Sequence, residues 1–122
     1  MKIALATARL TLIESRSRKV AFLREVVRLL DLRDVVVEEG RVDQFVARAN
    51  AADLVTVRGV RLNDGVADSA AKLLREDGVL TVFQSVDVLP QLTWFSSQRS
   101  YQLVSGQPSW LHVYRRLRID ID

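Results

Sequence analysis

Short runs of aliphatic and β-branched residues alternate along this chain with longer amphipathic stretches, and no other feature narrows its fold as much. The short runs predict β-strands, because such residues favour a pleated, buried surface. The longer stretches place apolar residues at helical spacing and predict helices. A repeated strand–helix–strand order implies parallel strands joined by right-handed crossovers. The expected strands cover residues 10–14, 35–38, 54–57 and 79–83, and the expected helices cover about 18–31, 42–50 and 65–76.

The C-terminal part of the chain predicts an antiparallel hairpin. Strands are expected over residues 99–105 and 109–117, because Gly-Gln-Pro at 106–108 is good turn chemistry. With 122 residues the chain has room for one α/β domain, 1–122, whose mostly parallel sheet carries this hairpin at one edge. His112 is then expected to be a partly exposed structural residue of an edge strand. The late aromatic residues are expected in the core: Trp94, Phe95, Tyr101, Trp110 and Tyr114.

Polar residues and a glycine indicate where two of the helices begin and end. Ser15 or Ser17 is expected to cap the helix at 18–31, since small polar side chains accept hydrogen bonds from the first backbone N–H groups. Asn63 or Asp64 is expected to cap the helix at 65–76, and Gly78 to end it in a left-handed conformation.

Composition excludes several kinds of site. The chain has no cysteine and a single histidine, so disulfides, thiolate ligands, cysteine nucleophiles and multi-histidine metal sites are excluded, and no metal is expected. No apolar run is long enough for a membrane span, and no signal peptide is recognisable, so a soluble, cytoplasmic protein is expected. Residues 1–33 carry eight Lys and Arg against three Asp and Glu, which fits either a polyanionic partner or a solvated helix face.

Ligands of open α/β sheets bind beyond the carboxyl ends of the strands, so the residues that close each strand are the candidates for a site. Glu14 closes the first expected strand and can accept both hydroxyls of a ribose; it fits equally a surface acid paired with a nearby arginine. Arg58 closes the third and can donate a forked pair of hydrogen bonds to a carboxylate or phosphate, or form an ion pair at the strand end.

A glycine-rich phosphate or cofactor loop is missing from the sequence. The five glycines are at positions 40, 59, 65, 78 and 106, so no Gly-x-Gly occurs, although a nucleotide-binding sheet normally needs one after its first strand. Residues 1–7 resemble the tail of a helix more than a strand with such a turn. Either the chain uses no dinucleotide-type cofactor, or it begins after the part that binds it. A nicotinamide-type enzyme is not expected.

Several segments resemble the bacterial guanine-N7 methyltransferases of small-subunit ribosomal RNA, the glucose-inhibited-division-B type. The resemblance runs from residue 1 to about 84 in the order that the family has, and the block over 10–26 is its most specific part. It rests on Met1–Ala4, Leu10–Ser15, Arg18–Val26, Gly40–Asp43, Asp53–Val60 and Asp77–Leu80.

The resemblance implies the three-layer, Rossmann-like fold of class I methyltransferases and the cofactor S-adenosylmethionine. It assigns Glu14 to the cofactor ribose, with Ser15 beside it. Val42 and Asp43 would frame the adenine, with Asp43 accepting from its amino group. Arg58 would be the catalytic residue of the methyl-transfer pocket, where it contacts the cofactor carboxylate or the target base.

The implied substrate is a guanine of 16S rRNA in the small ribosomal subunit. By the same resemblance Arg18 and Lys19 contact rRNA phosphates, although a solvated helix face explains both residues as well. No membrane partner is expected.

The sequence also departs from the family. The family's first strand and glycine-rich loop are lacking, Gln84 stands where the family has Lys, and Val42 and Gly59 each replace an Ala. Because that loop holds the methionine end of the cofactor, we expect this chain to bind S-adenosylmethionine weakly or not at all. The alternative function is a non-catalytic module, derived from such an enzyme, that binds RNA or protein; a homodimer would then cover its open sheet edges.

Overall fold

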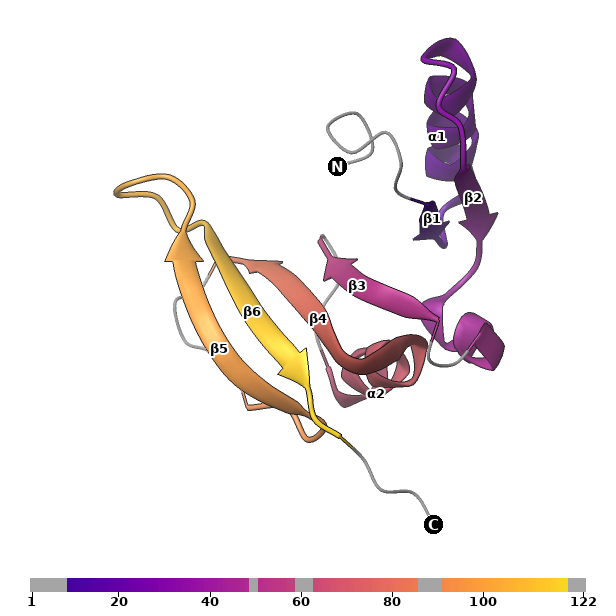
Figure 1. The fold of residues 1–122 in the computed structure, drawn as a ribbon. Helices are drawn as coiled ribbons and strands as arrows, with labels where there is room; N and C mark the ends of the chain where they lie inside the picture. Colours follow the sequence, from indigo (N-terminus) through magenta and orange to yellow (C-terminus); the bar gives the residue numbers. More distant parts are fainter. Residues whose placement is uncertain (1–8, 49–50, 59–62, 86–90, 119–122) are drawn as a thin grey trace. The chain divides into compact units, whose positions relative to one another are not determined.

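The computed structural model describes residues 9–48, 51–58, 63–85 and 91–118 (Figure 1). The chain divides into two units, Met1–Gln44 and Phe45–Asp122, and each is described by itself. The expected single domain over 1–122 therefore stays a prediction, and residues 1–7, expected to be a helix tail, lie outside the described residues. The elements are β1 (Leu10–Glu14), α1 (Ser17–Leu29), β2 (Val35–Glu39), the 3₁₀ helix η1 (Val42–Arg48), β3 (Ala52–Val57), α2 (Asp64–Leu73), β4 (Leu74–Gln84), β5 (Phe95–Gln102) and β6 (Trp110–Arg116).

The first unit is a strand–helix–strand motif with parallel strands. β1 pairs with β2 from Leu10 opposite Val35 to Glu14 opposite Glu39, as the alternation of patterns predicts. Val20 of α1 is 1% exposed and is the buried residue of this helix, whereas Phe22 and Leu29 are largely exposed, so only part of its apolar surface packs inward.

The predicted cap of α1 was wrong. The N-cap residue is Arg16, without a side-chain cap bond, and Ser17 is already helical. The backbone N–H of Arg16 donates instead to Oε1 of Glu14, at 3.2 Å. The last side chain of β1 thus binds the N-cap residue of α1, but it does not cap the N–H groups inside the helix.

The second unit contains a four-stranded sheet in the order β3-β4-β6-β5. β3 and β4 are parallel and joined through α2, whereas β6 is antiparallel to both β4 and β5. The parallel pairs and the C-terminal hairpin confirm the predicted α/β class. The predicted cap of α2 is confirmed too, because the Asn63 side chain accepts from the backbone N–H of Val66 at 2.9 Å.

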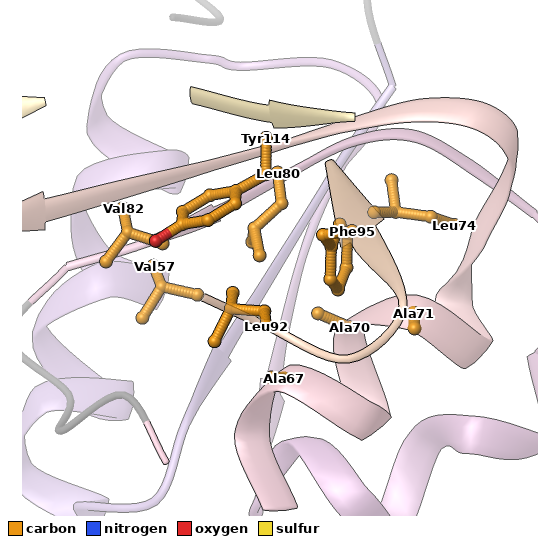
Figure 2. Close-up of a cluster of buried hydrophobic side chains, with 10 residues drawn as sticks. All are labelled: Val57, Ala67, Ala70, Ala71, Leu74, Leu80, Val82, Leu92, Phe95 and Tyr114. Atoms are coloured by element: carbon orange, nitrogen blue, oxygen red, sulfur yellow. The ribbon is translucent and has the colours of Figure 1, made fainter. Parts of the chain in front are cut away.

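The core of the second unit lies between α2 and its sheet (Figure 2). The fully enclosed residues that α2 contributes are alanines, and its partly buried Val66 packs against them. The rings of Phe95 and Tyr114 meet edge to face with centroids 6.1 Å apart. The cluster consists of Val57, Ala67, Ala70, Ala71, Leu74, Leu80, Val82, Leu92, Phe95 and Tyr114.

The end of the second helix differs from the prediction. α2 stops at Leu73, and β4 begins at once because Leu74 is fully buried and pairs with Ala52 of β3. The left-handed residue is Asp77, with φ 61°, and not Gly78. Gly78 is needed for space: a Cβ there would lie 2.8 Å from the carbonyl oxygen of Arg75.

The hairpin also corrects two expectations. His112 is fully buried, and its Nδ1 lies 2.7 Å from Oγ of Ser100, because β6 is an inner strand and β5 is the edge. Of the late aromatic residues, Phe95 and Tyr114 are buried as expected, but Trp94 and Tyr101 are 39% and 44% exposed.

The helix expected over 42–50 is the 3₁₀ helix η1.

Candidate functional site

The carboxyl ends of β1 and β2 place several of the predicted site residues at one end of the first unit. Glu14 is the last residue of β1, and its backbone carbonyl accepts from the N–H of Gly40, just after β2, at 3.0 Å. The carboxylate Oε1 accepts from Nε of Arg16 at 2.8 Å and from its backbone N–H. Both bonds use the same oxygen, so Oε2 has no hydrogen-bond partner among the described residues. Ser15 follows and is exposed.

The charge of Glu14 is fixed by this geometry. The hydrogen bond from the Arg16 guanidinium, the largest cause, lowers the pKa of the carboxyl below its ordinary value of 4.5. An ionised carboxylate only accepts hydrogen bonds, which suits a pair of hydroxyl donors.

We expect an NMR titration of the Glu14 carboxyl carbon to have its midpoint below 4.5, since the Arg16 bond favours the charged form. The stabilisation from this pair is present above pH 4.5 and is lost as the pH falls through the lowered pKa. In Arg16→Ala the midpoint should rise, because the largest cause of the lowered pKa is removed. Arg18→Ala is the control and should leave the Glu14 midpoint unchanged. An equal midpoint in the parent and in Arg16→Ala would contradict the role of Arg16.

Val42 and Asp43 begin η1, which is separated from the end of β2 by Gly40 and Arg41, so they follow the same end of the two-stranded sheet as Glu14. Val42 is half-buried, and the Asp43 side chain is 64% exposed. The Asp43 carboxylate is 3.6 Å from Nε of Arg41, a loose ion pair that a ligand donor can replace. The four residues predicted for the nucleoside part of a cofactor therefore follow the carboxyl ends of the same two strands, and their role stays a prediction.

The two cations predicted for RNA contact, Arg18 and Lys19, lie in the first turn of α1 and are exposed. Their exposure suits contact with a phosphate and a solvated helix face equally, so both interpretations stay open.

The second unit holds Arg58 beside a cavity. Arg58 follows β3 directly, and its guanidinium lies over the ring of Phe83 near the end of β4, 5.4 Å from the ring centroid. A cavity of about 310 Å³ opens at this point, where the two parallel strands end. Its lining residues are Arg58, Phe83, Gln84, Ser85, Leu103, Pro108 and Ser109.

The sequence singled out Arg58 as a strand-closing residue and Gln84 as a departure from the family, but it did not indicate the rest of this lining. Leu103, Pro108 and Ser109 come from the end of the hairpin, and they reach the cavity because Gln84 pairs with Trp110. The predicted turn at 106–108 was the available signal, but the strand register that carries it to the end of β4 was not predictable.

Among the described residues, no group of three or more His, Asp or Glu side chains could hold a metal ion. None of the helices in the described ranges is long and apolar enough to cross a membrane.

Several solved structures share this fold. A putative methyltransferase from Escherichia coli matches with a TM-score of 0.72 at 21% identity, covering 90% of this chain and 64% of its own. A mutant of MtNAS in complex with S-adenosylmethionine matches with a TM-score of 0.73 at 10% identity, covering 96% of this chain and 49% of its own. A protein from a study of disulfide-to-thioacetal conversion in echinomycin biosynthesis matches with a TM-score of 0.76 at 12% identity, covering 94% and 70%. The fold is thus the Rossmann-like α/β fold of this class of methyltransferases.

Sequence comparison identifies the family. The family model of rRNA small subunit methyltransferase G (GidB) matches residues 1–113, beyond the expected limit near residue 84, and the chain belongs to this family. The small-subunit rRNA methyltransferase G of Acidothermus cellulolyticus is 42% identical over 90 residues, 70% of this chain and 39% of the relative. Its counterpart in Chloroflexus aggregans is 30% identical over 112 residues, 89% of this chain and 46% of the relative. The chain thus spans less than half the length of these relatives.

Proposed function

We propose that this chain forms part of an S-adenosylmethionine-dependent methyltransferase that methylates N7 of a guanine in 16S rRNA. Its family membership supports the proposal. The observation that carries it is the cavity at the ends of β3 and β4, with Arg58 at its rim, where α/β sheets bind their ligands.

The residues of the first unit fit the nucleoside part of the cofactor. The ionised Glu14 has an oxygen available for the ribose hydroxyls, with Ser15 next to it in sequence, and the exposed Asp43 can accept from the adenine amino group. Val42 offers an apolar side chain to the adenine ring. The sequence holds no Gly-x-Gly turn for the methionine end. The nucleoside part therefore fits this chain, and the cradle for the rest of the cofactor is not among its residues.

Methyl transfer to N7 of guanine requires side chains mainly to align the reacting groups and to provide suitable charge. When bound, the cofactor supplies an electrophilic methyl group. N7 of guanine carries a lone pair and no proton, so methylation at this atom needs no general base. We assign Arg58 to holding the reacting partners in line, through the cofactor carboxylate or the target base, because its guanidinium is braced on Phe83 at the cavity.

The same proposal assigns Arg18 and Lys19 to rRNA phosphates, as exposed cations on α1. The small ribosomal subunit is the proposed partner, and the cytoplasm the proposed location. No specific observation favours the alternative of a non-catalytic module or a homodimer.

The test compares the chain alone with a completed enzyme, in which the Acidothermus cellulolyticus relative supplies the segments that this chain does not span. In calorimetric titration, we expect the chain alone to bind S-adenosylmethionine weakly or not at all and the completed enzyme to bind it with micromolar affinity. In a bacterial strain without its own methyltransferase G, the completed enzyme should restore 7-methylguanosine in 16S rRNA, measured by mass spectrometry. Micromolar binding by the chain alone would refute the claim that its cofactor site is incomplete. A completed enzyme that binds the cofactor but leaves the rRNA unmethylated would refute the proposed function.

A further inference from the structure

The cavity of the second unit contains groups that the proposed methyl transfer does not use. Gln84 ends β4, and Leu103, Pro108 and Ser109 come from the end of the β5–β6 hairpin. We infer that this cavity is a pocket for a single unpaired guanine and that Gln84 recognises its Watson–Crick edge. The inference rests on the proposed function and deepens it by naming the group that selects the base.

The size and the apolar surface of the cavity suit one nucleobase. About 310 Å³ is the lower end of the range of ligand pockets, roughly 300–1,000 Å³, and too little for a base pair with its backbone. Proteins that bind single bases stack them on aromatic rings or on arginine planes. The cavity has both together, because the Arg58 guanidinium lies over the Phe83 ring. Leu103 and Pro108 add apolar surface from the hairpin.

Gln84 supplies a hydrogen-bond acceptor that lacks a donor. Its Oε1 is buried and has no hydrogen-bond partner among the described residues. A buried acceptor without a donor is unfavourable, so a ligand N–H that reaches it gains affinity. The terminal torsion of glutamine has a broad range, so the carboxamide can turn toward the cavity that the same residue lines.

The chemistry of the missing donor favours guanine over adenine. The Watson–Crick edge of guanine carries two adjacent N–H donors, at N1 and N2, that can both reach one acceptor, whereas the same edge of adenine has a single amino donor, at N6, beside an acceptor at N1. Recognition of this edge leaves N7, on the opposite side of the base, open to the methyl group. An arginine fork onto O6 and N7, the commonest protein contact to guanine in DNA, would instead block the reacting atom.

A consequence is that the target must be unpaired. In a duplex the Watson–Crick edge is occupied by cytosine, so Gln84 reaches it only in a single-stranded or extruded nucleotide. The substrate class is therefore an unpaired guanine of RNA.

The test uses the full chain, without cofactor or RNA, and measures dissociation constants by NMR titration with four probes that share one ribose and one phosphate. The probes are GMP, AMP, 1-methyl-GMP and 7-deaza-GMP, a neutral analogue that has carbon in place of N7 and keeps the N–H donor at N1. We expect GMP and 7-deaza-GMP to bind alike, and AMP and 1-methyl-GMP to bind about tenfold more weakly, the scale of one good base contact. Loss of binding on replacement of N7, equal binding of GMP and 1-methyl-GMP, or no binding of GMP would overturn the inference.

Variants connect the preference to the residue. Gln84→Leu should abolish the tenfold preference for GMP. Gln84→Glu, which keeps an acceptor, should retain the preference, so it separates loss of recognition from misfolding at this position. Gln98→Leu, at an exposed glutamine of β5, is the matched control and should change nothing. A tenfold preference for GMP that persists in Gln84→Leu would contradict the role of Gln84. Because these titrations involve no methyl transfer, their outcome is distinct from that of the rRNA methylation test.

Discussion

Arg58→Ala in the completed enzyme is expected to lower the rate of methyl transfer to 16S rRNA by about 100-fold or more, the scale seen when one preorganised charge-stabilising donor is removed. Arg58 is exposed and packs on Phe83 at the cavity, so its removal should affect alignment more than folding. The measurement is the initial rate of labelled methyl incorporation into small ribosomal subunits.

Controls separate the role of Arg58 from general loss of positive charge. Arg115→Ala removes an equally exposed arginine from β6, away from the cavity lining, and should leave the rate within about twofold of the parent, as ordinary surface changes do. A rise in KM for the cofactor would indicate contact with its carboxylate, and a rise in KM for RNA would indicate contact with the base. A rate within threefold of the parent in Arg58→Ala would contradict a catalytic role.

Leu80→Ala is expected to reduce the free energy of unfolding by about 3 kcal/mol, the middle of the range for a fully buried leucine. Leu80 is 0% exposed and lies in the cluster beneath α2 (Figure 2). Urea denaturation followed by circular dichroism measures the change.

Leu54→Ala provides the same chemical change on the neighbouring strand, where the side chain is 37% exposed, and should cost well under half as much. If both substitutions cost the same, the second unit would not have its core between α2 and the sheet.

The strands and helices were predictable where side-chain pattern and pairing agree. β1 matches its predicted range because Leu10–Glu14 is bounded by polar sequence and pairs along its whole length with β2. β4 begins five residues earlier than predicted, at Leu74, because pairing with Ala52 overrides the helical preference of the sequence there. The left-handed turn went to Asp77 and not to the neighbouring glycine, since the glycine is required for close approach to a carbonyl.

Site residues were predictable where they stand at the end of a single strand, and not where their place depends on how strands pair. Glu14 and Arg58 lie at strand ends as expected. The cavity depends on the antiparallel register that brings Trp110 opposite Gln84 and the hairpin end beside it, and a sequence pattern does not fix such a register. For the same reason the edge position was given to β6, and the burial of its histidine was missed.

That buried imidazole is a ready-made spectroscopic reporter. His112 is the sole histidine of the sequence, so its ring resonances can be recognised without any assignment. Its Nδ1 faces the Ser100 hydroxyl across two paired strands, and β6 also carries Trp110, which pairs with Gln84. A nucleotide that enters the pocket should therefore move the imidazole signals slightly, whereas separation of the two hairpin strands would open the ring to rapid proton exchange with water.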